Sequence, residues 1–135
     1  MPRCALPRLA TLLCAALFCA TAAQAQIAGE TGRKFPATAL RGVMSFGSPP
    51  QIQLNGATTQ LAPGARIRDA GNLQVLSGEL NGSRAVVHYT TDLQGQPLLV
   101  WILTDAERAR QPWPTTAAQA QAWQFNADTQ TWTKP

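Results

Sequence analysis

Residues 52–61 read IQLNGATTQL, and this stretch decides the predicted fold. Apolar Ile52 and Leu54 alternate with glutamines up to Asn55-Gly56, and another short segment follows directly. Asn-Gly between alternating segments is the strongest short-range signal of a β-hairpin, because both central residues of the turn adopt positive φ. The stretch therefore predicts two antiparallel strands joined by a two-residue turn.

Further strand patterns lie on both sides of this hairpin. They occupy residues 38–46, 65–68, 73–80, 83–90 and 98–103. Asn81-Gly82 predicts a second hairpin, whose first strand is bent at Gly78. In the segment 65–68, Ile67 lies on the opposite face from its two flanking arginines. Residues 98–103 are apolar at every position, which predicts a strand that is covered on both faces.

The fold class follows from this spacing of strands and turns. Five or six short antiparallel strands within about 65 residues are typical of an all-β barrel or sandwich. So small a sheet must curl to cover its apolar face, so we expect a partly open barrel of the OB or SH3 kind. A capping box at Thr104 and Glu107 predicts a short helix to about Gln111, and Thr116 and Gln119 offer a second one.

The C-terminal tail, residues 112–135, is rich in aromatic residues. Its rings include Trp113, Trp123, Phe125 and Trp132. Disordered tails are poor in such side chains, so we expect the tail to dock on the barrel and complete its core. The alternative is that the rings meet a partner molecule.

The N-terminal 25 residues have the pattern of a secretory signal peptide. Two arginines precede an apolar run of about 12 residues, which is short for a membrane-spanning helix, and Ala23-Gln24-Ala25 offers a cleavage site. We therefore expect export to the periplasm, cleavage after Ala25 and no stable membrane anchor afterwards. All three cysteines lie inside this segment, so the mature chain has no thiol chemistry and needs no disulfide.

The mature chain, residues 26–135, is predicted to be one domain of 110 residues. A flexible leader at 26–37 precedes the β-barrel domain at 38–111 and the tail. The whole chain carries a net charge of +4, but without the two signal-peptide arginines nine basic residues face seven acidic ones. This net charge of +2 gives no electrostatic reason to expect that the mature chain binds nucleic acid.

Few residue patterns point to chemistry. His88 is the only histidine, and its place within a predicted strand favours a side chain at the surface or rim. A small hydrolase would need His88 to join Asp92, or another acid, and a hydroxyl such as Ser45, Ser77 or Ser83. Neither a nucleophile-elbow motif nor a set of metal ligands is present, and no phosphate or dinucleotide fingerprint implies a cofactor.

Arg66 and Arg68 form one candidate anion-binding pair. They share a face of their predicted strand, and Arg41 or Arg84 could join them to hold a phosphate or carboxylate. The alternative is an ordinary solvated face.

A likeness to known proteins rests on residues 54–56, 61–68 and 100–104, on Pro112-Trp113-Pro114 and on the closing residues 132–135. In these stretches the chain resembles small uncharacterised exported proteins of beta-proteobacteria. The resemblance implies a periplasmic setting in a Gram-negative cell, and it implies no activity and no site residues. The small β fold, the missing catalytic set and the aromatic tail lead us to expect a non-enzymatic binding or assembly module of the cell envelope, with an envelope protein or glycan as its partner. The alternative is a small periplasmic hydrolase or ligand-binding enzyme that uses His88.

Overall fold

The computed structural model describes residues 32–135. The predicted signal peptide, its cleavage site after Ala25, the cysteines and residues 26–31 of the predicted leader lie outside these described residues. Among the described residues, no helix has both the length and the apolar character needed to cross a membrane.

The described domain is mostly β, as predicted. A seven-stranded sheet has the order β3-β2-β1-β6-β7-β4-β5, and a separate hairpin pairs β8 with β9. The strands are β1 (Leu40–Phe46), β2 (Gln51–Leu54), β3 (Ala57–Gln60), β4 (Arg66–Arg68), β5 (Gln74–Val75), β6 (Arg84–Thr91), β7 (Pro97–Ile102), β8 (Gln124–Asn126) and β9 (Thr131–Thr133). Two short helices, α1 (Asp105–Ala109) and α2 (Ala117–Ala122), and the 3-10 helix η1 (Ser77–Leu80) complete the domain.

The hairpin that joins β2 and β3 is confirmed. Asn55 has a φ of 53° and Gly56 a φ of 83°, as a two-residue turn of this kind requires. Leu54 pairs with Ala57 across the turn, and Ile52 pairs with Thr59. Both predicted N-caps are also confirmed: Thr104 and Glu107 form a capping box at α1, which ends at Ala109, and Thr116 caps α2.

The strand prediction at residues 73–80 is wrong over most of its length. Only Gln74–Val75 forms a strand, and Ser77–Leu80 coils into η1. Leu73 and Leu76 are about two-thirds exposed, so the segment has no buried face to hold it extended. Asn81 has φ −52° and ψ 127°, and Gly82 has φ 85°, so the predicted second hairpin is instead a type II turn leading into β6.

The described residues form no closed barrel, and the main sheet has seven strands rather than five or six. It is also not purely antiparallel, because β4 runs parallel to β7. This pairing joins segments about thirty residues apart, and η1 and β6 lie between them along the chain. A parallel neighbour needs such a crossover, whereas the hairpin signals in the sequence report only antiparallel neighbours.

The sheet has an apolar cluster on each face. We call the first the inner core, and it contains Met44, Phe46, Ile52, Leu61, Ile67, Val87, Tyr89 and Val100. We call the second the aromatic layer, and it contains Phe35, Ala39, Leu103, Trp113 and Trp132, with Val86, Trp101, Ala120, Trp123 and Phe125 partly buried around them. Side chains alternate along a strand, so Val87 of β6 faces the inner core while its neighbours Val86 and His88 face the aromatic layer.

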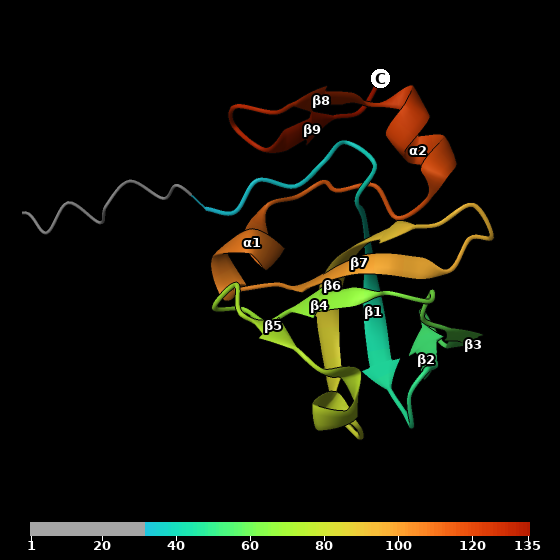
Figure 1. The fold of residues 1–135 in the computed structure, drawn as a ribbon. Helices are drawn as coiled ribbons and strands as arrows, with labels where there is room; N and C mark the ends of the chain where they lie inside the picture. Colours follow the sequence, from blue (N-terminus) through green and yellow to red (C-terminus); the bar gives the residue numbers. More distant parts are fainter. Residues whose placement is uncertain (1–31) are drawn as a thin grey trace, which may run out of the picture. The chain divides into compact units, whose positions relative to one another are not determined.

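The segment before β1 and the C-terminal tail together cover the face of the sheet that carries the aromatic layer. Figure 1 shows the β8–β9 hairpin and α2 above the segment that leads into β1, with the main sheet below. Phe35, which was predicted to lie in a flexible leader, is 3% exposed, and its main-chain N–H donates to Gln130 Oε1 at 2.8 Å. The described end of the leader is therefore packed between the sheet and the tail.

Candidate functional site

Trp113 lies at the centre of the aromatic layer. Its ring stacks on His88 with 4.1 Å between centroids, and it meets Phe35, Phe125 and Trp132 edge to face at about 6 Å. Its indole Nε1 donates to the carbonyl of Ala39 at 2.9 Å. The tail is thus fixed to the sheet by both packing and a buried hydrogen bond, as predicted for a docked tail.

His88 is a buried residue, so the prediction of a surface or rim side chain is wrong. It is 1% exposed, because Trp113 stacks on one side and Phe35 meets its ring edge to face at 4.5 Å. Its Nε2 accepts a hydrogen bond from Arg41 Nε at 3.2 Å, which places the ring proton of the neutral form on Nδ1. The period of β6 indicates which face His88 occupies, but not that the tail covers this face.

Burial lowers the pKa of His88 to about 2, and the charges of Arg41, Arg33 and Arg110 contribute to the shift. The side chain is therefore a neutral acceptor rather than a proton shuttle at neutral pH. Asp92, its predicted acidic partner, caps the turn after β6 and accepts instead from the N–H groups of Gln94 and Gln96. Among residues 32–135, no acid forms a hydrogen bond with His88, whose Nε2 accepts from Arg41 and whose Nδ1 has no partner.

We predict that His88 makes the fold sensitive to mild acid. The unfolded chain takes up a proton on His88 below about pH 6.5, whereas the folded chain does not. The free energy of unfolding should fall by about 1 kcal/mol per pH unit between pH 6.5 and 5. Urea unfolding at pH 7, 6 and 5 measures this slope, and His88→Phe should flatten it.

Glu107 supplies the comparison for that experiment. Despite burial, the hydrogen bonds and charge of Arg33 hold the pKa of its carboxyl below the usual value of 4.5, so its contribution to stability is lost only below about pH 4.5. A decrease confined to that lower range would assign the acid sensitivity to Glu107. Equal slopes above pH 5 in the wild type and in His88→Phe would contradict the role given to His88.

Arg33 and Glu107 form a buried ion pair beside the aromatic layer. Arg33 Nε and one terminal nitrogen donate to the two carboxylate oxygens at 2.9 and 2.6 Å, and the guanidinium also reaches the carbonyls of Asp69 and Ile102. Burial alone would raise the pKa of Glu107, but the hydrogen bonds from Arg33 and Thr104 outweigh it. The pair therefore attaches the leader to the start of α1.

Arg41 binds the same helix without a carboxylate partner. Its terminal nitrogens donate to the carbonyls of Glu107, Arg108 and Arg110 at 2.8 to 3.1 Å, and its Nε donates to His88. Burial lowers the pKa of this guanidinium, although the charge of Glu107 opposes the shift. The Glu107 carboxylate itself is bound to Arg33. Within the described part of the chain, Arg41 thus carries a half-buried positive charge whose hydrogen-bond acceptors are all neutral.

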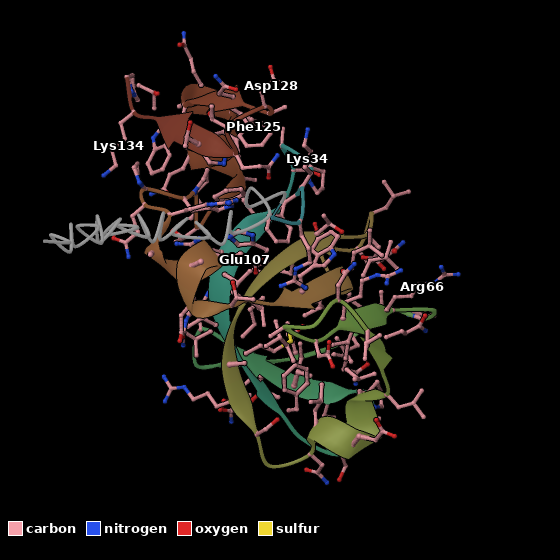
Figure 2. All side chains as sticks on the ribbon, turned by 90° about the vertical axis from the view of Figure 1, so that its left-hand side faces the viewer. Lys34, Arg66, Glu107, Phe125, Asp128 and Lys134 are labelled. Atoms are coloured by element: carbon pink, nitrogen blue, oxygen red, sulfur yellow. The ribbon has the colours of Figure 1, made fainter. Side chains whose placement is uncertain are left out.

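A pocket of about 300 Å³ opens where Arg41 meets the tail, and we call it the tail pocket. Its lining includes Arg41, Trp113, Thr115, Gln119, Trp123 and Lys134, and none of the acidic residues between 32 and 135 lines it. The Lys134 ammonium lies 5.2 Å from the centre of the Trp123 ring, so a second cation stands at its rim. Figure 2 shows Lys134 projecting from the tail and Glu107 below it in the body of the domain.

The predicted partner-binding aromatics divide into two groups. Trp113 and Trp132 are about 5% exposed and belong to the core, so the docking interpretation applies to them. Trp123 and Phe125 are half-buried, and Trp123 borders the tail pocket. Trp123 therefore offers a half-buried ring to the tail pocket, beside the buried Trp113 that also lines it.

The predicted anion pair lies elsewhere. Arg66 is exposed on β4, whereas Arg68 is half-buried and donates to the carbonyl of Asn72 at 3.1 Å. Figure 2 shows Arg66 on the opposite side of the domain from Lys134. Arg41 does not join the pair, because its guanidinium is bound at α1 and His88.

Comparisons of the chain with protein families, with curated proteins and with solved structures give no match. Within residues 32–135, no three His, Cys, Asp or Glu side chains lie close enough together to hold a metal ion.

Sequence reasoning missed the roles of Arg33, Arg41 and Gln130. Arg33 lies in a polar segment that resembles a linker, and Arg41 alternates with apolar neighbours as a solvated strand residue does. Gln130 is 4% exposed, accepts from Phe35 and donates to the carbonyl of Ala127. The one local signal was the capping box, since Glu107 performs its capping role and the ion pair at once.

Proposed function

We propose that the chain is an exported periplasmic protein and a non-enzymatic binding module of the cell envelope. The N-terminal charge, apolar run and cleavage site support export, as does the resemblance to exported proteins. The proposed ligand is an anionic envelope glycan, recognised through a sugar carboxylate in the tail pocket.

The observation that carries this proposal is the charge of Arg41 in the tail pocket. A half-buried guanidinium normally has a carboxylate or phosphate partner, because burial without a counter-ion costs free energy. Among the described residues, the acceptors of Arg41 are carbonyls and one imidazole, no acid lines the pocket, and Lys134 adds a second positive charge to it. An incoming carboxylate would supply the missing negative charge.

The remaining lining favours a hydroxylated ring as the carrier of that carboxylate. Thr115 and Gln119 supply polar groups, and the Trp123 indole supplies an aromatic edge. Sugar recognition commonly needs both, since a sugar ring presents hydroxyls around its rim and an apolar face. The pocket volume of about 300 Å³ is at the lower end for small-molecule sites, which suits one sugar residue.

We also propose that the main sheet is curled into a partly open barrel. Ile52 of β2 and Ile67 of β4 both belong to the inner core, although β1, β6 and β7 lie between their strands. In a flat sheet the two strands would stand about 19 Å apart, so a shared core favours a curled sheet. A rigid, curled sheet would hold the tail pocket in a fixed geometry.

We expect glucuronate to bind the purified protein in the millimolar range and neutral glucose not to bind. Two-dimensional NMR should show glucuronate shifting the indole signals of Trp113 and Trp123. Lys134→Gln should weaken binding about two- to five-fold, as expected for one exposed charge. Arg66→Gln is the matched control, because it removes an equal charge from the other candidate anion site and should leave affinity unchanged.

Two results would contradict the site assignment. Loss of glucuronate binding in Arg66→Gln, with Lys134→Gln unaffected, would transfer the site to β4. Equal binding of glucose and glucuronate would show that the pocket does not recognise the carboxylate. Export is tested separately. We expect the protein recovered from the periplasm to begin at Gln26.

A further inference from the structure

Among the strands of residues 32–135, β3 forms one edge of the main sheet. In a two-residue hairpin the residues that flank the turn exchange hydrogen bonds, so Leu54–Ala57 and Ile52–Thr59 are the bonded pairs. The bond from Leu61 N–H to the Pro50 carbonyl continues this alternation. The main-chain N–H and C=O groups of Thr58 and Gln60 therefore point away from β2, toward solvent.

This edge lacks the features that usually block strand pairing. Its four residues, Ala57–Gln60, contain no charge, no proline and no bulge, and Thr58 and Gln60 are exposed. The opposite edge, β5, is only two residues long, and short edge strands pair poorly. Figure 1 shows β3 at the far side of the sheet from β5, clear of the segments that cover the aromatic layer.

A pocket lies on the same side of the sheet as the Thr58 side chain. Ser45, Gln53 and Thr58 stand opposite one another across β1, β2 and β3, so their side chains form one row on one face. The row borders a pocket of about 390 Å³, which Gln51 also lines. Phe46 and Ile52 border it as well, although their side chains alternate with this row and belong to the inner core. A strand added beyond Thr58 would place its own side chain in this row, next to the pocket.

We propose that β3 is a docking edge for an extended, uncharged peptide segment of a partner protein, which adds an antiparallel strand and places an apolar side chain in this pocket. The unpaired groups of Thr58 and Gln60 provide main-chain hydrogen bonds, and the pocket provides side-chain selection, as in other strand-addition complexes. A second copy of this chain fits less well, because paired β3 strands would present only short polar side chains to the pocket. The inference does not depend on the tail pocket.

The test uses a synthetic peptide, acetyl-Ser-Thr-Leu-Thr-Leu-Thr-Ser-amide, titrated into the purified protein and followed by NMR. The residues that exchange hydrogen bonds with Thr58 and Gln60 lie on the pocket face, so they should be the two leucines. We expect weak binding that shifts the main-chain amides of Thr58 and Gln60. N-methylation of both leucine amides should weaken binding about tenfold or more, whereas N-methylation of the threonine amides should not.

Variants of the protein test the same edge. Thr58→Pro removes an outward N–H without removing a bond between β2 and β3, so it should abolish peptide binding and leave the fold intact. Thr58→Val keeps this N–H and is the matched control, and Gln60→Pro repeats the test if Thr58→Pro fails to fold.

Three outcomes would overturn the inference. They are no peptide binding at millimolar concentration, equal loss on N-methylation of either set of amides, and a dimer that forms through β3 without peptide. A protein that does not bind glucuronate could still bind the peptide at β3, so the two experiments test the two proposals independently.

Discussion

Replacing Trp113 with alanine is expected to cost about 3–5 kcal/mol of unfolding free energy, the range for large aromatic residues removed from a core. The ring contacts His88, Phe35, Phe125 and Trp132, so its loss opens a cavity between the sheet and the tail. It also leaves the buried carbonyl of Ala39 without its indole donor. Single domains have only about 5–15 kcal/mol of stability, so urea denaturation should show a large shift of the midpoint.

Trp123→Ala is the control for this experiment. Trp123 is half-buried at the edge of the same aromatic layer, so its removal should cost much less than the loss of Trp113. Equal effects of the two substitutions would mean that the tail is held as one loose unit, without Trp113 as its anchor.

Glu107→Ala is the second change for which we expect a large effect, again about 3–5 kcal/mol. It leaves the Arg33 guanidinium, whose side chain is 12% exposed, without its counter-ion, and it removes half of the capping box at Thr104. Chemical denaturation at pH 7 measures the loss. Glu79→Ala removes an exposed acid and should change stability by less than about 0.5 kcal/mol.

The double variant Arg33→Met with Glu107→Leu distinguishes the net contribution of the ion pair from the cost of leaving one buried charge unpaired. A buried pair replaced as a unit by apolar residues costs far less than a pair broken on one side. We therefore expect the double variant to be more stable than Glu107→Ala. If it is less stable, the bonds from Arg33 to the carbonyls of Asp69 and Ile102 must contribute more than the ion pair.

Local signals in the sequence predicted the local features of the fold. Asn55-Gly56 identified a hairpin because positive φ is a property of those two residues, and Thr104 with Glu107 identified a helix start by hydrogen bonds three residues apart. The parallel pairing of β4 with β7 left no such signal. It depends on a crossover whose segments meet only after the sheet has formed.

The candidate site was less predictable, because it is made where three distant segments converge. The aromatic tail predicted that its rings dock on the domain, whereas the pattern of β6 favoured a surface or rim position for His88, and neither indicated that Trp113 stacks on His88. Likewise, Arg41 looks like a solvated strand residue until the carbonyls of α1 are placed around it. Alternation shows which face a side chain occupies, and only the tertiary structure shows what covers that face.

The hydrogen bond between Phe35 and Gln130 joins residues 95 positions apart and has a consequence for biosynthesis. A ribosome delivers the chain from its N-terminus, so Phe35 emerges seconds before Gln130 and Trp132 are made. During that interval the outer apolar face of the sheet has no cover and can associate with other nascent chains. We therefore expect docking of the C-terminal hairpin to be the last step of folding, and truncation before Trp132 to leave an aggregation-prone chain.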